Sequence, residues 1–465
     1  MAIWTPSLTG RRGPKYRQIL DALTEEIEAG TLVPGMRLPP HRDLAYALGV
    51  SANTTSRAYA EGVARALLRG EVGRGTYVRE LPGPAPHEGP MDLCRPPAEG
   101  PIDLSRNLPA PGDGAMYLAQ TLAELSRGAD LRGLLDYQTE AGQPGQVVAL
   151  VRWLEGLGVP SLRDEVVITI GAQHGILATL MAVTQPGDLL ATEALTYAPL
   201  RAMARRLGLR TRAVAMDGKG LSPQALDALC REASVRALYL TPTFQTPTGV
   251  TLEADRRAEL VAIARRHDLL VIEDDVFGSL APVRPPALAT LAPERTIYLT
   301  SLSKCLGPGL RVGMAKAPKA LAECIRGSVT LSCWMPPPLM AEVAACWIRE
   351  GSATRMAEAR QVGTARRRTL AREVLGGLDA GVGDYAPHVW LVAPEGWTAD
   401  SLRAEAARRG VWITEGAAFA TDPATCPEAV RICLGHEADE GRLRRGLACL
   451  RDILSGPRGG SSLIL

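Results

Sequence analysis

One lysine among small hydroxyl residues is the strongest candidate for chemistry in this sequence. Lys304 ends the run TSLSK, and two residues separate it from the run GPGLR, which ends at Arg311. A lysine held rigidly beside a cofactor ring can form a Schiff base, and the hydroxyls of Ser301 and Ser303 together with Arg311 suit a bound phosphate. The pattern therefore predicts a covalent lysine site, although a Ser-rich surface turn fits it as well.

Four other segments could complete such a site. The turn GAQ, which contains Ala172 and Gln173, opens a predicted helix, and the N–H groups of a helix start bind phosphate, although an ordinary helix start fits too. Asp274 ends the apolar run VIED, where a carboxylate could keep a pyridine nitrogen protonated. The Pro-rich turn TPTFQTPTG contains Thr246. Arg431 could hold a carboxylate through its two-pronged guanidinium.

A second group of polar and basic residues lies near the N-terminus. The segment SANTTSR, residues 51–57, opens a predicted helix, and the start of a recognition helix enters the major groove of DNA. Nearby arginines would contact phosphates, with a wing loop near the minor groove. A helical protein-interaction domain fits the same periodicity. The predicted DNA contacts are Arg37, Arg42, Ser51, Asn53, Thr54, Thr55, Arg57, Arg74 and Gly75.

The elements that would position these DNA contacts can be predicted from periodicity. Residues 15–29 and 40–48 fit helices, residues 51–68 fit a third helix with Ser51 as its N-cap, and residues 72–78 fit a hairpin. Helices followed by a β wing indicate a winged helix-turn-helix domain over residues 1–80. Seven prolines and three glycines in residues 81–101 predict a linker.

The remaining residues, 102–465, alternate between two patterns. Short apolar runs predict strands at 166–170, 189–192, 237–241, 269–273 and 297–300, with helices at 174–183 and 254–266. This alternation predicts an α/β fold with a mostly parallel sheet. From about residue 318 the pattern changes, which predicts a smaller α+β domain over 318–465.

The composition limits the classes of protein to which this chain can belong. The net charge is only +2 over 465 residues, although residues 31–79 hold seven Arg and three acidic residues, which suits a phosphate-facing surface or a solvated face. Nine cysteines without a C-x-x-C pair predict neither a disulfide framework nor a metal site. Residues 1–20 lack an apolar leader and no run of 18 apolar residues exists, so we expect a cytoplasmic location and no membrane contact.

Residues 13–79 resemble the GntR family of DNA-binding domains. The resemblance rests on RLP with Arg42, on the helix that begins at Ser51 and contains NTTSRAY, and on the wing GRGTYV. Gly62 departs from the family, which usually carries an apolar residue there. A mid-helix glycine should loosen the third helix by about 1 kcal/mol.

Residues 101 to about 455 resemble fold-type I aminotransferases. The resemblance implies that Lys304 forms the Schiff base with pyridoxal 5'-phosphate, that Asp274 pairs with the pyridine nitrogen, and that Arg431 binds a carboxylate. It also implies that Tyr197 stacks on the ring and that Tyr137 reaches the phosphate of a partner subunit; packing aromatics are the alternative for both. The implied phosphate site is Ala172, Gln173, Ser301, Ser303 and Arg311.

Two positions depart from the aminotransferase pattern. Thr246 replaces the asparagine of the Asn-Pro-x-Gly turn, and Phe277 replaces the tyrosine three residues after Asp274. In the family both residues hydrogen-bond the cofactor's 3-hydroxyl. Phe277 has no hydroxyl and Thr246 is shorter, so we expect cofactor binding to persist and transamination to be poor.

The order of the two parts resembles the MocR subfamily of bacterial regulators. This resemblance implies a head-to-tail, domain-swapped homodimer that binds double-stranded operator DNA and pyridoxal phosphate. Its effector would be an amine, an amino acid or the cofactor itself. Two alternatives stay open: an active aminotransferase with a regulatory head, which a turnover assay would detect, and a regulator whose body has lost the cofactor, which an absorbance band would exclude.

Overall fold

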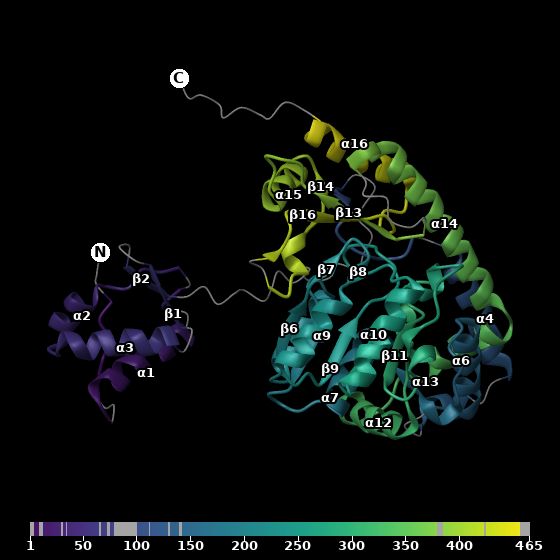
Figure 1. Ribbon diagram of the computed structural model, residues 1–465, viewed down its shortest axis with the longest axis horizontal. Helices are drawn as coiled ribbons and strands as arrows, with labels where there is room; N and C mark the ends of the chain where they lie inside the picture. The colour runs from purple at the N-terminus through teal and green to yellow at the C-terminus, as the bar shows by residue number, and fades with distance from the viewer. Residues whose placement is uncertain are drawn as a thin grey trace. The chain divides into compact units, whose positions relative to one another are not determined.

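The computed structural model describes two compact units, residues 1–93 and 94–465, which we call the head and the body. Each is described by itself (Figure 1). The structure describes residues 4–8, 13–28, 31–33, 35–64, 67–71, 75–78, 100–110, 112–128, 131–138, 142–378, 385–422 and 425–455. Most of the predicted linker, 81–101, therefore lies outside the described residues.

The head consists of three helices and a hairpin. Helices α1 (Lys15–Glu28), α2 (His41–Leu48) and α3 (Ala52–Ala64) precede strands β1 (Leu68–Glu71) and β2 (Gly75–Val78), which pair antiparallel. Gly49 ends α2 in the left-handed conformation, with φ of 63°. Buried side chains of all three helices and the wing share one apolar core: Ile19, Leu20, Leu23, Leu32, Leu38, Leu44, Ala58, Tyr59, Leu68 and Val78.

One expectation about the third helix was wrong. The helix ends at Ala64 rather than at residue 68, because Leu68 begins the wing and is buried in the core. Gly62 is also more than a weak point in the helix. A Cβ at Gly62 would lie 2.9 Å from Cδ1 of Leu68 and 3.5 Å from Cδ2 of Leu23, so the glycine allows the helix, the wing and α1 to pack closely.

The body is built on a seven-stranded sheet in the order β4-β12-β11-β10-β9-β5-β6. The pairs among β6, β5, β9, β10 and β11 are parallel, and β12 is antiparallel to both of its neighbours. The prediction of a mostly parallel sheet is thus confirmed. The strands are β4 (Val166–Thr169), β5 (Leu189–Glu193), β6 (Arg210–Val214), β9 (Ala237–Leu240), β10 (Leu270–Asp274), β11 (Thr296–Ser301) and β12 (Gly313–Lys316).

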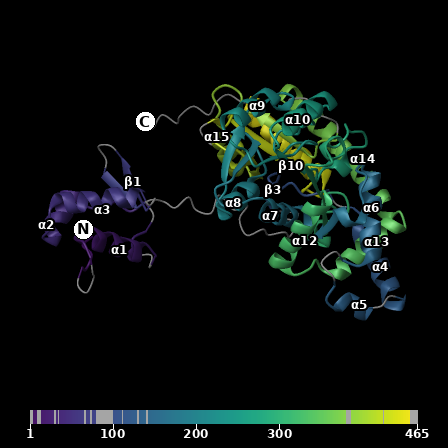
Figure 2. The same cartoon turned by 60° about the horizontal axis from the view of Figure 1, so that its bottom comes forward.

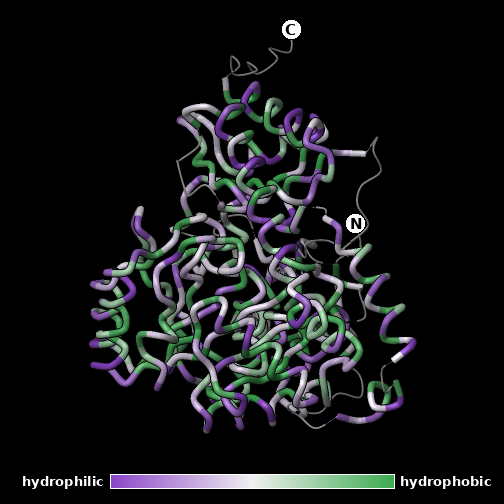
Figure 3. The backbone as a smooth tube through the Cα atoms, turned by 90° about the vertical axis from the view of Figure 1, so that its right-hand side faces the viewer, coloured by the Kyte–Doolittle hydropathy of each residue, from purple (hydrophilic) through white to green (hydrophobic). Residues whose placement is uncertain are grey.

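Helices cover both faces of this sheet, because alternate strand residues point to opposite sides. Ile168 packs with α6 (Pro144–Gly156) and α13 (Pro338–Arg349), whereas its neighbour Val167 packs with α7 (Gly171–Val183) and α12 (Lys319–Cys333). Figure 3 shows the apolar segments running through the interior of the body. The other helices are α4 (Gly114–Gly128), α5 (Leu131–Leu135), α8 (Ala198–Arg206), α9 (Pro223–Glu232), α10 (Ala254–Arg266) and α11 (Leu288–Leu291).

The small domain begins later than residue 318. Helix α12 packs against α7, and α13 packs against α6, so both belong to the core of the large sheet (Figure 2). A separate core begins within α14 (Ser352–Leu375): its first half packs with the large sheet and its last two turns pack with the small domain. One continuous helix therefore joins the two domains, and a change in sequence pattern could not locate the boundary inside it.

The small domain combines the last quarter of the chain with the first described residues of the body. Strands β13 (His388–Val392), β16 (Ala429–Cys433) and β15 (Thr414–Glu415) form its antiparallel sheet, with helices α15 (Ala399–Arg408) and α16 (Glu440–Ser455). Strand β3 (Ile102–Asp103) pairs parallel with β14 (Val411–Trp412). A further hairpin, β7 (Met216–Asp217) with β8 (Gly220–Leu221), lies in the large domain. In the part of the chain that the structure describes, every helix is too short or too polar to cross a membrane.

Candidate functional site

Lys304 is half-buried and lies just beyond the end of β11, where hydrogen bonds of the strand end and the turn hold its backbone. Oγ of Ser301 accepts a hydrogen bond from the N–H of Ser303 at 3.1 Å and donates to the carbonyl of Val312 at 3.1 Å. The ammonium group of Lys304 donates to the backbone carbonyl of Asn107 and lies 5.4 Å from the centre of the Phe277 ring. The lysine is thus held between two segments that are far apart in the sequence.

Asp274 ends the neighbouring strand β10 and is buried. Its Oδ2 accepts a hydrogen bond of 2.6 Å from the hydroxyl of Tyr239 on β9, whereas its Oδ1 is buried without a hydrogen-bond partner among the described residues. Burial raises the pKa of Asp274 to about 6, and the hydrogen bond from Tyr239 opposes this rise. A buried acceptor of this kind suits a cationic N–H donor such as a protonated pyridine.

The start of α7 and Arg311 form the other end of the site. Gly171 has a φ of 75°, and a Cβ there would lie 2.9 Å from Nη2 of Arg311. Arg311 donates to the carbonyl of Ile170 at 3.1 Å and is exposed, as is Gln173. The hydroxyl of Tyr197 donates to Oε1 of Gln173 at 3.4 Å. A guanidinium beside the open N-terminus of a 13-residue helix suits a phosphate group.

His174, which sequence reasoning missed, fixes that helix start. Its Nδ1 accepts the N–H of Ile170 at 3.0 Å, and its Nε2 lies 2.8 Å from Oγ of Ser332 on α12. Burial and the nearby charge of Arg311 lower the pKa of His174, which favours the neutral ring that this geometry needs. Its position one turn into the helix was the available signal.

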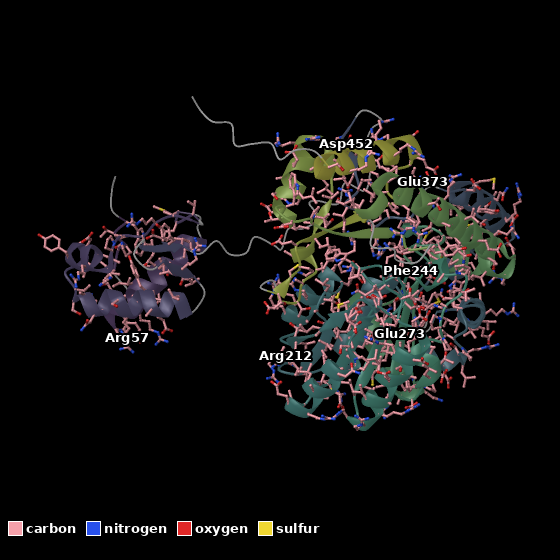
Figure 4. The ribbon with its side chains drawn as sticks, turned by 45° about the horizontal axis from the view of Figure 1, so that its top comes forward. Arg57, Arg212, Phe244, Glu273, Glu373 and Asp452 are labelled. Atoms are coloured by element: carbon pink, nitrogen blue, oxygen red, sulfur yellow. The ribbon has the colours of Figure 1, made fainter. Side chains whose placement is uncertain are left out.

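The two departures from the aminotransferase pattern lie in buried positions. Phe277 is 4% exposed and packs at a tilt against His388, with ring centres 6.0 Å apart. Thr246 is 6% exposed and precedes a cis peptide bond to Pro247. Phe244, labelled inside the body in Figure 4, belongs to the same apolar cluster as Phe277. Neither departure opens the site to water.

Arg431 on β16 faces the segment that carries Asn107. It is 4% exposed, donates to the carbonyl of Ser105 at 2.7 Å, and stacks 4.6 Å above the centre of the Phe419 ring. Its Nε is buried without a hydrogen-bond partner among the described residues. A guanidinium with unused donor capacity can bind a carboxylate.

A small pocket of about 20 Å³, room for about one water molecule, lies beside Lys304. Phe277 and Lys304 line it from the large domain, Arg360 and Arg367 from α14, and residues 107–110 from the N-terminal segment of the body. The amine of Lys304 therefore borders a pocket that residues of distant segments line together.

Tyr137 is placed apart from the other predicted residues. Its side chain is 81% exposed and packs edge-on against Trp334, with ring centres 5.7 Å apart. Trp334 is itself 58% exposed, and Leu135 and Leu331 are 85% and 78% exposed. We call these four side chains, which lie at the C-terminal ends of α5 and α12 where Tyr137 contacts Trp334, the α5–α12 patch.

The predicted DNA contacts divide into exposed and buried residues. Arg37, Arg42, Ser51, Asn53 and Arg57 are exposed and Thr54 is half-buried; Arg57 also lies over the Tyr16 ring at 4.1 Å and is labelled in Figure 4. Ser51 caps α3, because its Oγ accepts the N–H of Thr54 at 3.2 Å. Gly75 begins β2, with a φ of 121° beside the Arg37 side chain. Arg74 lies outside the described residues.

The structure contradicts the prediction that Thr55 contacts DNA. Its side chain is completely buried, and its hydroxyl donates to the carbonyl of His41 at 2.7 Å. The residue joins α3 to α2 and cannot reach a base edge. Helical periodicity explains the error, since Thr55 lies on the inner face of α3 with Ala58 and Tyr59.

Comparison with known proteins agrees with both parts of the chain. Residues 99–446 match the family described as aminotransferase class I and II, and residues 15–78 match the gntR family of bacterial regulatory proteins. The regulator YdeF of Bacillus subtilis is 28% identical over 454 residues, which cover 97% of this chain and 96% of YdeF. The chain belongs to the MocR subfamily of GntR-type transcription regulators.

Two relatives of this MocR-type chain have names that mention vitamin B6 or pyridoxine. The vitamin B6 salvage pathway transcriptional repressor PtsJ of Salmonella typhimurium is 30% identical, and the match covers 88% of this chain and 91% of PtsJ. The pyridoxine biosynthesis regulator PdxR of Corynebacterium glutamicum is 29% identical, and the match covers 78% of this chain and 79% of PdxR.

Solved structures show the fold of the body. An archaeal alanine:glyoxylate aminotransferase superposes with a TM-score of 0.71 at 23% identity, over 77% of this chain and 91% of that protein. The Thermus thermophilus α-aminoadipate aminotransferase LysN superposes with a TM-score of 0.69 at 24% identity, over 77% of this chain and 92% of LysN. The predicted fold-type I body is confirmed. Its cofactor is pyridoxal 5'-phosphate, which the buried Oδ1 of Asp274 and the guanidinium beside Gly171 fit.

Proposed function

We propose that this regulator senses an amine, an amino acid or pyridoxal phosphate itself through Lys304 and changes its operator binding in response. When bound, pyridoxal phosphate supplies an electrophilic carbon that amines attack reversibly. The chain's own residues would bind and orient it: the start of α7 with Arg311 would receive the phosphate, and Asp274 would hold a proton at the pyridine nitrogen. Arg431 would bind the carboxylate of an amino-acid effector.

The single observation that carries this proposal is the contrast between Asp274 and Phe277. The buried acceptor Oδ1 of Asp274 is available to the cofactor, whereas the ring of Phe277 offers no hydroxyl to it. A site that keeps the groups for cofactor binding and lacks a group that supports proton transfer suits reversible effector exchange. The effector would then signal without being consumed.

The deciding experiment compares Lys304→Ala with Lys319→Ala in full-length protein. Lys319 is a matched control because its side chain is 66% exposed and pairs with Asp164 at 3.1 Å on the surface. Operator affinity is measured while amines and amino acids are titrated into cofactor-loaded protein. We expect at least a tenfold response in wild type and Lys319→Ala, and none in Lys304→Ala.

Two outcomes would contradict the proposal. An undiminished response in Lys304→Ala would show that effectors act elsewhere, and repeated turnover of a physiological amino acid by wild type would favour an aminotransferase with a regulatory head. Borohydride reduction and peptide mapping identify the attachment site independently. A pyridoxyl group on Lys316 or Lys319 would refute the assignment of Lys304.

We also propose a head-to-tail homodimer in the cytoplasm, in which the partner subunit covers the α5–α12 patch. Large apolar side chains are seldom exposed together unless another molecule covers them. Trp334→Arg should therefore raise the monomer fraction in analytical ultracentrifugation, whereas Val283→Arg, at a site 90% exposed elsewhere on the body, should not. A fully dimeric Trp334→Arg would exclude this patch as the interface.

A further inference from the structure

Three residues from separate parts of the body join Lys304 in one chain of hydrogen bonds. The ammonium of Lys304 donates to the carbonyl of Asn107 in the N-terminal segment. The Nδ2 of Asn107 lies 3.1 Å from Nδ1 of His388 on β13, and Nε2 of His388 lies 3.1 Å from the carbonyl of Gln245. Gln245 precedes Thr246 in the turn that belongs to the large domain.

The direction of these bonds follows from the groups involved. An amide Nδ2 can only donate, so Nδ1 of His388 must accept, and a carbonyl can only accept, so Nε2 of His388 must donate. This requires the neutral ring with its proton on Nε2. Burial, followed by the charge of Arg431, lowers the pKa of His388 to about 3, which agrees with the neutral ring.

The surroundings of His388 hold its ring in this orientation. The ring is completely buried, packs against Phe277, and lies in a strand whose backbone pairs with Cys433 of β16. Phe277 in turn contacts the ammonium of Lys304. A small-domain side chain that does not touch the lysine amine is therefore connected to it through Asn107 and Phe277.

We propose that His388 is a positioning residue that acts through Asn107 to hold the amine of Lys304 and to connect it to the small domain. The inference rests on the proposed role of Lys304 as the sensing lysine. It assigns to His388 and Asn107 the control of how readily that amine reacts. A hydrogen bond to the Asn107 carbonyl stabilises the ammonium form and restricts its motion, so losing the connection should make the amine more reactive.

The test measures lysine reactivity in cofactor-free, full-length protein. Limiting acetic anhydride followed by peptide mass spectrometry gives the acylation rate of each of the five lysines, so Lys219 and Lys319 serve as internal standards. We expect His388→Leu and Asn107→Ala to raise the rate at Lys304 at least threefold relative to these standards. The matched control is His267→Leu, since His267 pairs with Asp227 away from the site.

Conservative variants separate positioning from packing. Asparagine at position 388 can keep the acceptor that faces Asn107, whereas glutamine can keep only the donor that faces Gln245. His388→Asn should therefore restore most of the wild-type rate and His388→Gln should not. Absorbance should also show faster uptake of pyridoxal phosphate by His388→Leu and Asn107→Ala than by His267→Leu, because the more reactive amine attacks the cofactor's aldehyde sooner.

An unchanged Lys304 rate in Asn107→Ala would overturn the inference, even if His388→Leu fails to fold. Equal rates in His388→Asn and His388→Gln would likewise show that the ring only fills space. Neither measurement uses effector or DNA. An effector-insensitive wild type would contradict the proposed function, whereas an unchanged labelling pattern contradicts the positioning role.

Discussion

Restoring the missing hydroxyl at position 277 should affect the cofactor-free and cofactor-loaded protein in opposite ways. Phe277 is 4% exposed and surrounded by Phe244, Leu280 and Ala386 in an apolar cluster. Phe277→Tyr places a hydroxyl where the family's tyrosine donates to the cofactor's 3-hydroxyl. Without cofactor we expect that hydroxyl to have no acceptor, since the nearby ammonium of Lys304 is a donor, whereas with cofactor it has one.

The magnitude follows from the cost of a buried polar group. A hydroxyl buried without a partner costs about 1–3 kcal/mol, and a hydrogen bond to the cofactor removes that cost. Phe277→Tyr should thus lower the stability of the cofactor-free protein by about 1–3 kcal/mol. The same free energy should strengthen pyridoxal phosphate binding by roughly 5- to 150-fold.

The assay combines a cofactor titration, followed by absorbance, with thermal unfolding of both forms. Phe244→Tyr is the matched control, because it adds the same hydroxyl to the same cluster and should weaken both forms alike. If Phe277→Tyr destabilises both forms equally, or binds cofactor no better than wild type, the assignment of position 277 to the 3-hydroxyl is refuted. Adding Thr246→Asn should increase any single-turnover transamination.

Four further predictions concern other parts of the chain. Burial raises the pKa of Asp274 to about 6 from its usual value of 3.8. The contribution of Asp274 to stability is therefore complete below pH 3.8 and is lost as the pH rises through 6. The thermal midpoint of the cofactor-free wild type should fall more between pH 4 and 7 than that of Asp274→Asn. Arg311→Ala should weaken binding of pyridoxal phosphate roughly 10- to 150-fold in an absorbance titration while leaving pyridoxal, which lacks the phosphate, unaffected. Gly62→Ala gains about 1 kcal/mol of helix propensity but forces a Cβ to 2.9 Å from the wing, an overpacking cost of about 1–3 kcal/mol, so its head should unfold at a temperature equal to or below that of wild type in calorimetry. Arg57→Ala should weaken operator binding and reduce the salt dependence by about one charge in a fluorescence titration, and unchanged values would remove α3 from the groove.

The strands that the sequence predicts correctly are those marked by a run of apolar residues. Apolar runs located β4, β5, β9, β10 and β11 because both faces of a parallel sheet are covered. It missed β6, whose sequence RTRAV is largely exposed, and β12, whose sequence GMAK has only two apolar side chains between a glycine and a lysine. It also extended α3 to Leu68, because an apolar residue in register with a helix is indistinguishable from the first residue of a buried strand.

The parts of the site that sequence reasoning missed depend on contacts between distant residues. Asn107 and His388 are 281 residues apart, and nothing in either local pattern marks them as partners. Tyr239 lies within a predicted strand, but its hydroxyl bond to Asp274 depends on the order of β9 and β10 in the sheet. Motifs identify residues that bind a ligand, whereas the residues that hold those ligand-binding groups are determined by topology.

The chain enters the body at the small domain, which affects how an effector signal could reach the head. Residues 100–103 are fastened to the small domain: β3 pairs with β14, and Arg442 of α16 donates to the carbonyls of Gly100 and Pro101 at 3.0 and 2.9 Å. The covalent route from the head therefore meets the small domain before any strand of the large sheet. A displacement of that domain shifts the attachment point of the linker directly, so the length and stiffness of residues 81–101 set how much of the displacement reaches the head.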